Sequence, residues 1–190
     1  YLINKGLSES ESENNIQRKA KITRELGVYY RKRGQLDSAI IHYDNSIKIY
    51  EQLKDSSGVL FVEIAKANVL KAKGDFSQAI NIFNNAIIFF EGKGDKGKKK
   101  SLMIKNNLAG VYIAMKDWEN SGKYLEEIYN DSFIKGNKAI LSSICINLVA
   151  VKTKLSLLDE ALQYANEALE LVKRPRSLAN LYTNIGAIYE

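Results

Sequence analysis

Apolar side chains recur along this chain at steps of three and four residues, the spacing that places them on one face of an α-helix. In the first such stretch Ile22 and Leu26 precede a break at Gly34, and Ile40 and Tyr43 follow it. A glycine at the end of one helix and a polar residue at the start of the next are typical of a tight turn. The pattern therefore predicts two amphipathic helices joined by a short turn.

This helix pair recurs about every 40 residues. The small residue Ala39 of the first copy corresponds to Ala79, Ser121 and Ala161 in the next three. In all four copies a first-helix residue lies 12 positions earlier, Gly27 in the first copy, and a further second-helix residue lies 7 positions later. Two spacings kept in four copies indicate an internal repeat, whose small residues are expected to lie where the paired helices cross.

The turn between the two helices carries its own signals. Gly34-Gln35, Gly74-Asp75 and Lys116-Asp117 occupy equivalent places in the first three copies. Asp75 followed by Gln78 predicts a capping box at the start of a second helix. With a single proline in 190 residues, a chain spent mostly inside helices is expected.

The repeat resembles the tetratricopeptide repeat family. The residues that carry the resemblance are Leu26-Gly27, Tyr30, Gly34, Ala39, Tyr43 and Ser46 in the first complete copy, Leu108-Ala109, Tyr112, Trp118, Ser121 and Leu125 in the third, Leu148, Leu158, Ala161 and Ala168 in the fourth, and Ile185-Gly186 and Tyr189 at the start of a fifth. Three residues depart from the family pattern: Ile128 replaces a small residue, Ala165 an aromatic one, and Lys152 a tyrosine. The period exceeds the family's usual 34 residues, as in the longer-repeat branch found in bacterial signalling sensors and kinesin light chain.

The resemblance implies an all-α fold: a right-handed α-solenoid of antiparallel helix pairs with about ten helices and no sheet. We predict complete repeats at 15–57, 58–98, 99–137 and 138–175. Residues 1–14 are expected to hold the second helix of a truncated repeat plus a linker, and 176–190 the first helix of another. Both ends would then lie inside a repeat of a longer protein, and apolar residues such as Leu181, Ile185 and Ile188 would lack a following repeat, which predicts homo-association through the open ends.

Composition limits the chemistry of the chain. One cysteine excludes an internal disulfide and a cysteine-rich zinc site, and one histidine excludes a multi-histidine metal site. We therefore predict no catalytic residue, no cofactor and no metal. Cys145 is expected to be a buried small apolar residue, and His42 a surface or half-buried helical one. The longest charge-free run, Phe76–Phe90, is too short for a membrane span.

A run rich in lysine and glycine lies between the second and third copies. It contains Lys93, Lys96, Lys98, Lys99 and Lys100. No strand precedes it and no Gly-Lys-Ser/Thr follows in register, so it does not match a phosphate-binding loop. We expect a flexible solvated loop, with contact to an anionic partner as the alternative.

Ligands of the tetratricopeptide repeat family usually lie along the groove lined by the first helices, so the resemblance implies a peptide-binding groove. The groove-facing candidates are Lys21, Arg24, Val28, Arg31, Lys32, Phe61, Ile64, Asn68, Lys71, Met103, Asn106, Asn107, Ser143, Asn147, Asn180 and Asn184. Asn107, Asn147 and Asn184 are equivalent positions of successive first helices. An amide both donates and accepts, which suits the backbone of an extended peptide. Hydrogen bonding between helices is the alternative role of this column.

The function expected from these features is a non-enzymatic scaffold that binds a protein or peptide segment, an acidic one where the basic groove residues lie. The period, and a richness in Lys, Asn and Ile typical of AT-rich bacterial genomes, favour the sensor or interaction part of a larger bacterial signalling or regulatory protein. We expect it in the cytoplasm, with the periplasm as the alternative. The net charge of +6 leaves a nucleic-acid-binding helical repeat as the alternative function, although acidic residues interrupt a basic stripe. Glu126 and Glu127 are expected to face solvent.

Overall fold

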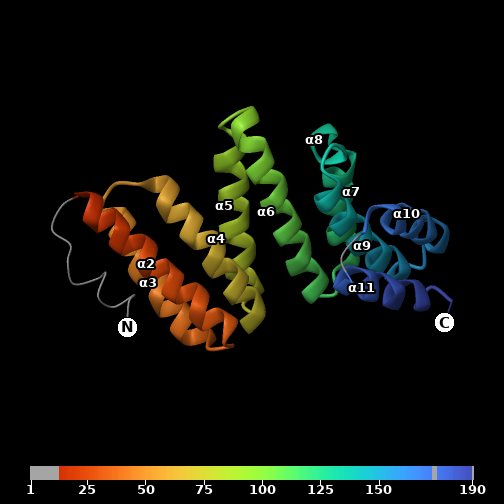
Figure 1. Cartoon of the computed structure of the whole chain (residues 1–190), viewed down its shortest axis with the longest axis horizontal. Coiled ribbons are helices and arrows are strands. Elements are labelled where there is room, and N and C mark those ends of the chain that lie inside the picture. The colour runs from red at the N-terminus through yellow and green to blue at the C-terminus, as the bar shows by residue number, and fades with distance from the viewer. Residues whose placement is uncertain (1–12, 173–174, 190) are drawn as a thin grey trace. The chain divides into compact units, whose positions relative to one another are not determined.

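The computed structural model describes residues 13–172 and 175–189. Helices take up 86% of these described residues and none of them lies in a strand, which confirms the all-α prediction. The helices are α2 (Glu13–Lys32), α3 (Leu36–Gln52), α4 (Ser56–Lys73), α5 (Phe76–Glu91), α6 (Asp95–Ala114), α7 (Trp118–Asn130), α8 (Ser132–Lys135), α9 (Lys138–Lys154), α10 (Leu158–Leu171) and α11 (Pro175–Gly186) (Figure 1). The helix expected near the N-terminus falls in 1–12, outside the described residues.

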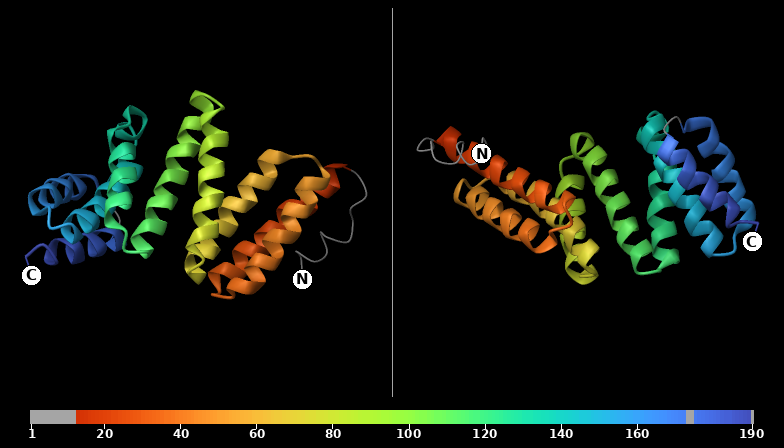
Figure 2. Two further views of the ribbon diagram at one scale, coloured as in Figure 1. Left: turned by 180° about the vertical axis from the view of Figure 1, so that it is seen from behind. Right: turned by 60° about the horizontal axis from the view of Figure 1, so that its bottom comes forward.

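The chain divides into two compact units, 1–86 and 87–190, and the division falls within α5. In the first unit α2 packs against α3, and α3 against α4, around a core that includes Ala39, Tyr43 and Val62 (Figure 2). In the second unit α6 pairs with α7 and α9 with α10, while α11 lies against α9. The antiparallel helix pair expected from the sequence is therefore the building block of each unit.

Small residues occupy the predicted helix crossings. Ala39, Ala79, Ser121 and Ala161 have no exposed surface at all. The Ser121 hydroxyl donates to the carbonyl of Ala109 on the paired helix at 3.2 Å, so even the polar member of the column is satisfied. The repeat register that the sequence predicted is the register of the packing.

The turn inside each repeat needs one residue in the left-handed conformation. Gly34 and Gly74 supply it in the first two repeats, with φ of 75° and 86°. The equivalent residues of the next two repeats, Lys116 and Ser156, adopt φ of 61° and 58°. The same closing hydrogen bond follows in each turn, for example from the Asp117 amide to the Tyr112 carbonyl at 2.9 Å. The turn geometry is thus shared, although glycine is not.

We expect Lys116→Gly to stabilise the protein by about 0.5–1 kcal/mol, because a residue with a Cβ pays a steric cost in the left-handed region that glycine does not. Chemical denaturation of the parent and the variant measures the difference. The control is Lys123→Gly on the exposed face of α7, which should cost about 1 kcal/mol because glycine is a poor helix former. Equal losses in both variants would refute the strain at position 116.

Two predictions need correction. The lysine-rich run is a turn only at 92–94, because α6 already begins at Asp95 and includes Lys98–Lys100. At the other end of the chain, Leu181 and Ile188 are buried against the core of the second unit, and Ile185 packs on it. The apolar face that was expected to be open at these positions is therefore covered by the other helices of the second unit.

Candidate functional site: the first-helix face

One position of every first helix is open to solvent. It holds Lys21, Phe61, Met103, Ser143 and Asn180, all exposed. Phe61 and Met103 keep 54% and 52% of their surface accessible, which is unusual for large apolar side chains. The five exposed residues lie six positions before the first-helix residues Gly27, Ala67, Ala109, Val149 and Gly186. The register that turns most of those residues toward the paired helix leaves this position uncovered.

In the first unit, cations and an aromatic ring share this face. The Arg24 guanidinium lies 4.8 Å over the Phe61 ring, which brings α2 and α4 together at two predicted groove positions. Arg24 also pairs with Glu25. Lys71 is half-buried, and burial lowers the pKa of its ammonium. Lys21, Arg31 and Lys32 are exposed, and Val28 and Ile64 are half-buried.

The Asn68 amide is occupied locally. Its Nδ2 donates to the Ile64 carbonyl one turn earlier at 3.0 Å. This hydrogen bond within α4 occupies the amide nitrogen of Asn68, which reduces the capacity of the side chain to bind a ligand backbone.

In the second unit, a pocket of about 540 Å³ opens between α9, the end of α10 and the start of α11. Three predicted groove residues, Ser143, Asn147 and Asn180, line it together with Ile146. Lys138, Ala139, Ser142, Glu170, Leu171, Val172 and Ser177 complete the lining. The pocket thus combines amide and hydroxyl groups with an aliphatic wall, which is the composition of a small binding site.

The asparagine column is divided in role. Asn184 Nδ2 donates to the Ile146 carbonyl of the neighbouring first helix at 3.2 Å, the interhelix bond that the alternative reading required. Asn147 instead lines the pocket, and Asn107 is half-buried. Next to it, Oδ1 of Asn106 is buried with no hydrogen-bond partner among the described residues.

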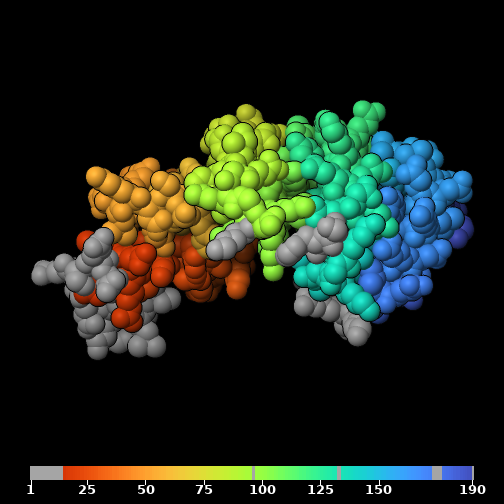
Figure 3. Space-filling model, turned by 90° about the horizontal axis from the view of Figure 1, so that it is seen from above, coloured from red at the N-terminus to blue at the C-terminus, as the bar shows by residue number. Residues whose placement is uncertain are grey.

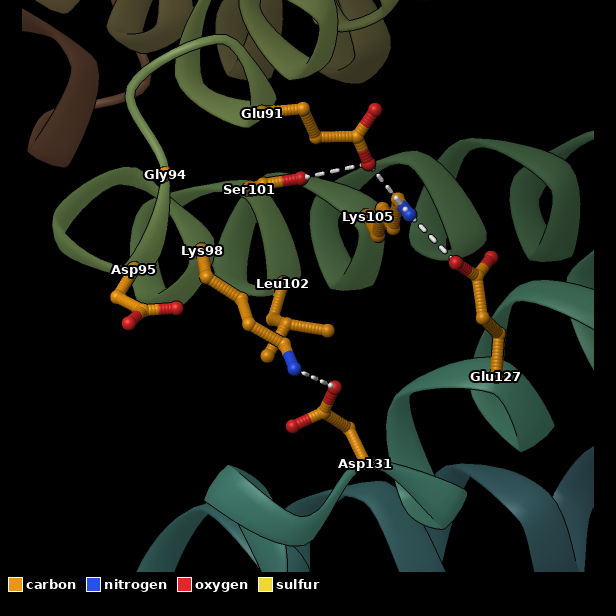
Figure 4. Close-up of a pocket in the computed structure, with 9 residues that line it drawn as sticks. All are labelled: Glu91, Gly94, Asp95, Lys98, Ser101, Leu102, Lys105, Glu127 and Asp131. Atoms are coloured by element: carbon orange, nitrogen blue, oxygen red, sulfur yellow. Dashed lines mark hydrogen bonds and ion pairs between the residues drawn. The ribbon is translucent and has the colours of Figure 1, made fainter.

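A second cavity, of about 390 Å³, was not expected from the sequence (Figure 4). Its wall is ionic: Lys105 Nζ lies 2.8 Å from Glu91 and 2.5 Å from Glu127, and Lys98 lies 2.9 Å from Asp131. The hydrogen bond from Lys105 lowers the pKa of the Glu91 carboxyl. Glu127 is exposed, as expected, and also binds a lysine. A comparison of the repeats could have indicated a paired lysine at this place, because Lys105 occupies the position that buried Cys145 holds in the next repeat.

Lys152, one of the departures from the family pattern, is almost wholly buried. Its ammonium lies 2.5 Å from Glu126 and 2.7 Å from Glu160, so it joins α9 to α7 and α10. Burial alone would lower the pKa of Lys152, but the hydrogen bonds to both carboxylates outweigh it and raise the pKa. Glu126, which was expected to face solvent, is partly exposed and also binds the Lys152 ammonium.

The remaining candidate side chains have structural surroundings. Cys145 is fully buried, and burial raises the pKa of its thiol to about 12. His42 is half-buried and stacks on Tyr30 with ring centroids 4.9 Å apart. Over residues 13–172 and 175–189, no three His, Cys, Asp or Glu side chains gather as a metal site requires. In the same ranges no helix is long and apolar enough to cross a membrane.

Comparison with known proteins shows what one part of the chain resembles. Residues 18–88 match the model of the tetratricopeptide repeat. This part of the chain is similar to the tetratricopeptide repeat family. Proteins of this family are generally non-enzymatic scaffolds for protein–protein interaction.

Similar proteins extend the likeness beyond the matched residues. BtubC from P. vanneervenii has the same fold with a TM-score of 0.74 at 20% identity, over 89% of this chain and 68% of that one. A signal transduction ATPase with numerous domains from Pyrococcus horikoshii, which carries a tetratricopeptide repeat sensor, gives 0.75 at 16% identity, over 98% of this chain and 27% of that one. The 26S proteasome regulatory subunit RPN5 of Saccharomyces cerevisiae is 27% identical over 137 residues, 69% of this chain. The chain spans only 30% of the length of this curated relative.

Proposed function

We propose that the whole chain is a tetratricopeptide repeat protein and that it binds a peptide or protein segment on its first-helix face. The observation that carries the proposal is that the same first-helix position is exposed in each unit and holds a large apolar side chain there, Phe61 in the first unit and Met103 in the second. Exposed aromatic and aliphatic groups gain free energy when a partner covers them, and the surrounding polar groups select which partner does so.

We further propose that the partner is acidic where it meets the first unit. Lys21, Arg24, Arg31, Lys32 and Lys71 are the cations of that face. Burial disfavours the charged form of the Lys71 ammonium, so a carboxylate of the partner placed beside it would stabilise that charge. This part of the binding should weaken as salt is added.

In the second unit we propose that the pocket lined by Ser143, Asn147 and Asn180 holds the backbone of an extended segment. Asparagine amides can donate to peptide carbonyls and accept from peptide N–H groups at the same time. Asn184, already bonded to Ile146, is proposed to brace the two helices instead.

We propose that the whole chain is the sensor or interaction part of a larger bacterial signalling or regulatory protein. The repeat period of about 40 residues agrees with the longer-repeat branch, and the Pyrococcus horikoshii protein carries its repeats as a sensor. We propose a cytoplasmic location, and self-association through the chain ends stays a prediction.

The test begins with a random peptide library displayed on phage and selected on the whole chain. Selected peptides are then titrated against Asn147→Ala and Asn180→Ala. Each change should weaken binding by roughly tenfold or less, because one neutral hydrogen bond contributes about 0.5–1.5 kcal/mol. Asn166→Ala, an exposed asparagine of the second helix α10, is the matched control and should bind as the parent does.

Thermal melting of the same variants separates binding from bracing. Asn184→Ala should lower the melting temperature while the folded protein keeps its affinity for peptide. If Asn147→Ala lowers the melting temperature and leaves affinity unchanged, the pocket is not the peptide site. If no selected peptide depends on any residue of the first-helix face, the proposed function is wrong.

A further inference from the structure

The lysine-rich run forms the end of a helix hairpin. We call residues 88–100 the α5–α6 tip: the last turn of α5, the turn at 92–94 and the first turns of α6 (Figure 1). Side chains of this yellow-green segment face the viewer when the molecule is seen from above (Figure 3). Lys93, Lys98, Lys99 and Lys100 are all exposed.

Two glycines hold the tip in one conformation. Gly94 has a φ of 61°, in the left-handed region that favours glycine. A Cβ on Gly97 would lie 1.8 Å from the carbonyl oxygen of Phe90, so only glycine allows α6 to approach the end of α5 this closely. The lysines are therefore displayed on a folded helix end, in contrast to the flexible loop expected from the sequence.

An apolar side chain accompanies the lysines. Ile88 is 70% exposed at the end of α5, the most exposed large aliphatic side chain among the described residues. Phe89 beside it is half-buried, and the Lys93 ammonium lies 4.8 Å over its ring. Lys100 lies 5.0 Å over the ring of Phe90. Two lysine ammonium groups of the tip therefore lie over apolar rings, and exposed Ile88 directly precedes one of these rings in the chain.

The charge of the tip is strongly one-sided. Five lysines stand against Glu91 and Asp95 alone within 88–100, and no arginine is present. Lys98 pairs with Asp131, and Lys105 is shared between Glu91 and Glu127. The five lysines of the tip together with Lys105 outnumber the four carboxylates Glu91, Asp95, Glu127 and Asp131, so positive charge remains in excess.

We propose that the α5–α6 tip docks on the surface of an anionic lipid bilayer. Lysines near such a surface are attracted to its negative potential, and an adjacent exposed isoleucine can enter the boundary between head groups and acyl chains. A nucleic acid would use the lysines but gain nothing from Ile88, and its phosphates are better matched by the arginine fork that the tip lacks. The proposal does not depend on peptide binding by the first-helix face.

Sedimentation with vesicles tests the charge. Phosphatidylcholine vesicles with and without phosphatidylglycerol are mixed with the whole chain at low and high salt. We expect binding only to vesicles with phosphatidylglycerol, weakened by salt. The triple variant Lys93→Gln, Lys99→Gln, Lys100→Gln should lose roughly tenfold or more in partitioning, since each lysine near an anionic bilayer contributes about fivefold.

The matched control removes the same charge elsewhere in the second unit. Lys116→Gln, Lys123→Gln, Lys154→Gln changes three exposed lysines outside the tip and should retain most of the binding. Thermal melts of both triple variants check that each is folded. Equal losses in the two variants would show that net charge alone drives binding and would overturn the proposal, as would equal binding to neutral vesicles.

Ile88 supplies a separate readout. The Ile88→Trp variant should show a blue shift of its tryptophan emission when vesicles with phosphatidylglycerol are added, beyond any change of the parent, whose single tryptophan is Trp118. Emission that does not move while the protein sediments would exclude insertion of the tip. Binding of duplex DNA that the tip variant abolishes, with no vesicle binding, would overturn the lipid assignment in favour of nucleic acid.

Discussion

Replacing Gly27 with alanine is expected to destabilise the first unit by about 1–2 kcal/mol, although alanine is the better helix former. A Cβ at this position would lie 2.6 Å from two ring carbons of Tyr43, which is fully buried and has no room to withdraw. Overpacking of this kind typically costs about 1–3 kcal/mol. The gain in helix propensity, about 1 kcal/mol at most, does not offset the upper part of that range. Chemical denaturation followed by circular dichroism measures the net effect.

Gly186 is the matched control, because it occupies the equivalent repeat position at the end of α11. A Cβ there meets no atom within 4 Å. Gly186→Ala should therefore leave stability unchanged or raise it slightly. If Gly27→Ala proves as harmless as Gly186→Ala, then the close approach of α2 to Tyr43 is absent in solution, and the assigned crossing is wrong.

Lys152→Ala is expected to cost about 2–4 kcal/mol. The change removes the buried aliphatic stem of the side chain and separates the carboxylates of Glu126 and Glu160 from their shared cation. Both carboxylates are partly exposed and can turn toward water, so the loss lies below that of a fully enclosed charge pair. Urea denaturation of the whole chain gives the difference in unfolding free energy.

Lys154→Ala provides the comparison on the same helix. Lys154 is exposed and lies two residues further along α9, so its removal should change stability by no more than about 0.5 kcal/mol. Similar small losses for both lysines would mean that the Lys152 ion pairs contribute nothing measurable. Such a result would also leave the departure from the family's tyrosine without a stabilising reason.

The helix pairs and their register were predictable because both depend on local regularities. Helical periodicity assigns each side chain to a face, and four copies with the same two spacings identify the crossing residues, among them Ala39 and Ser121. The N-terminal cap of α5 was predictable too, since Asp75 accepts from the Gln78 amide at 3.3 Å. In a standard capping box the Gln78 side chain would accept from the backbone N–H of Asp75. Here its Nε2 donates to the Asp75 carboxylate instead.

The lysine-rich run shows where local reasoning failed. Glycine and lysine in such numbers are typical of a solvated loop, yet α6 begins at Asp95. The reason is tertiary, because Gly97 is needed where α6 meets the Phe90 carbonyl of the preceding helix. A glycine required for close approach and a glycine that loosens a loop look the same in a sequence.

By itself the sequence determined the helical class of the chain and the repeat of helix pairs, because these follow from residue spacing along single helices. Only the tertiary structure decided which polar side chains meet. It paired Lys105 with Glu127 across 22 positions and Asn184 with the Ile146 carbonyl across 38. These choices depend on the angle and offset at which neighbouring helices cross. A shift of one helical turn there exchanges a side chain's partner without changing the hydrophobic pattern that sequence reasoning uses.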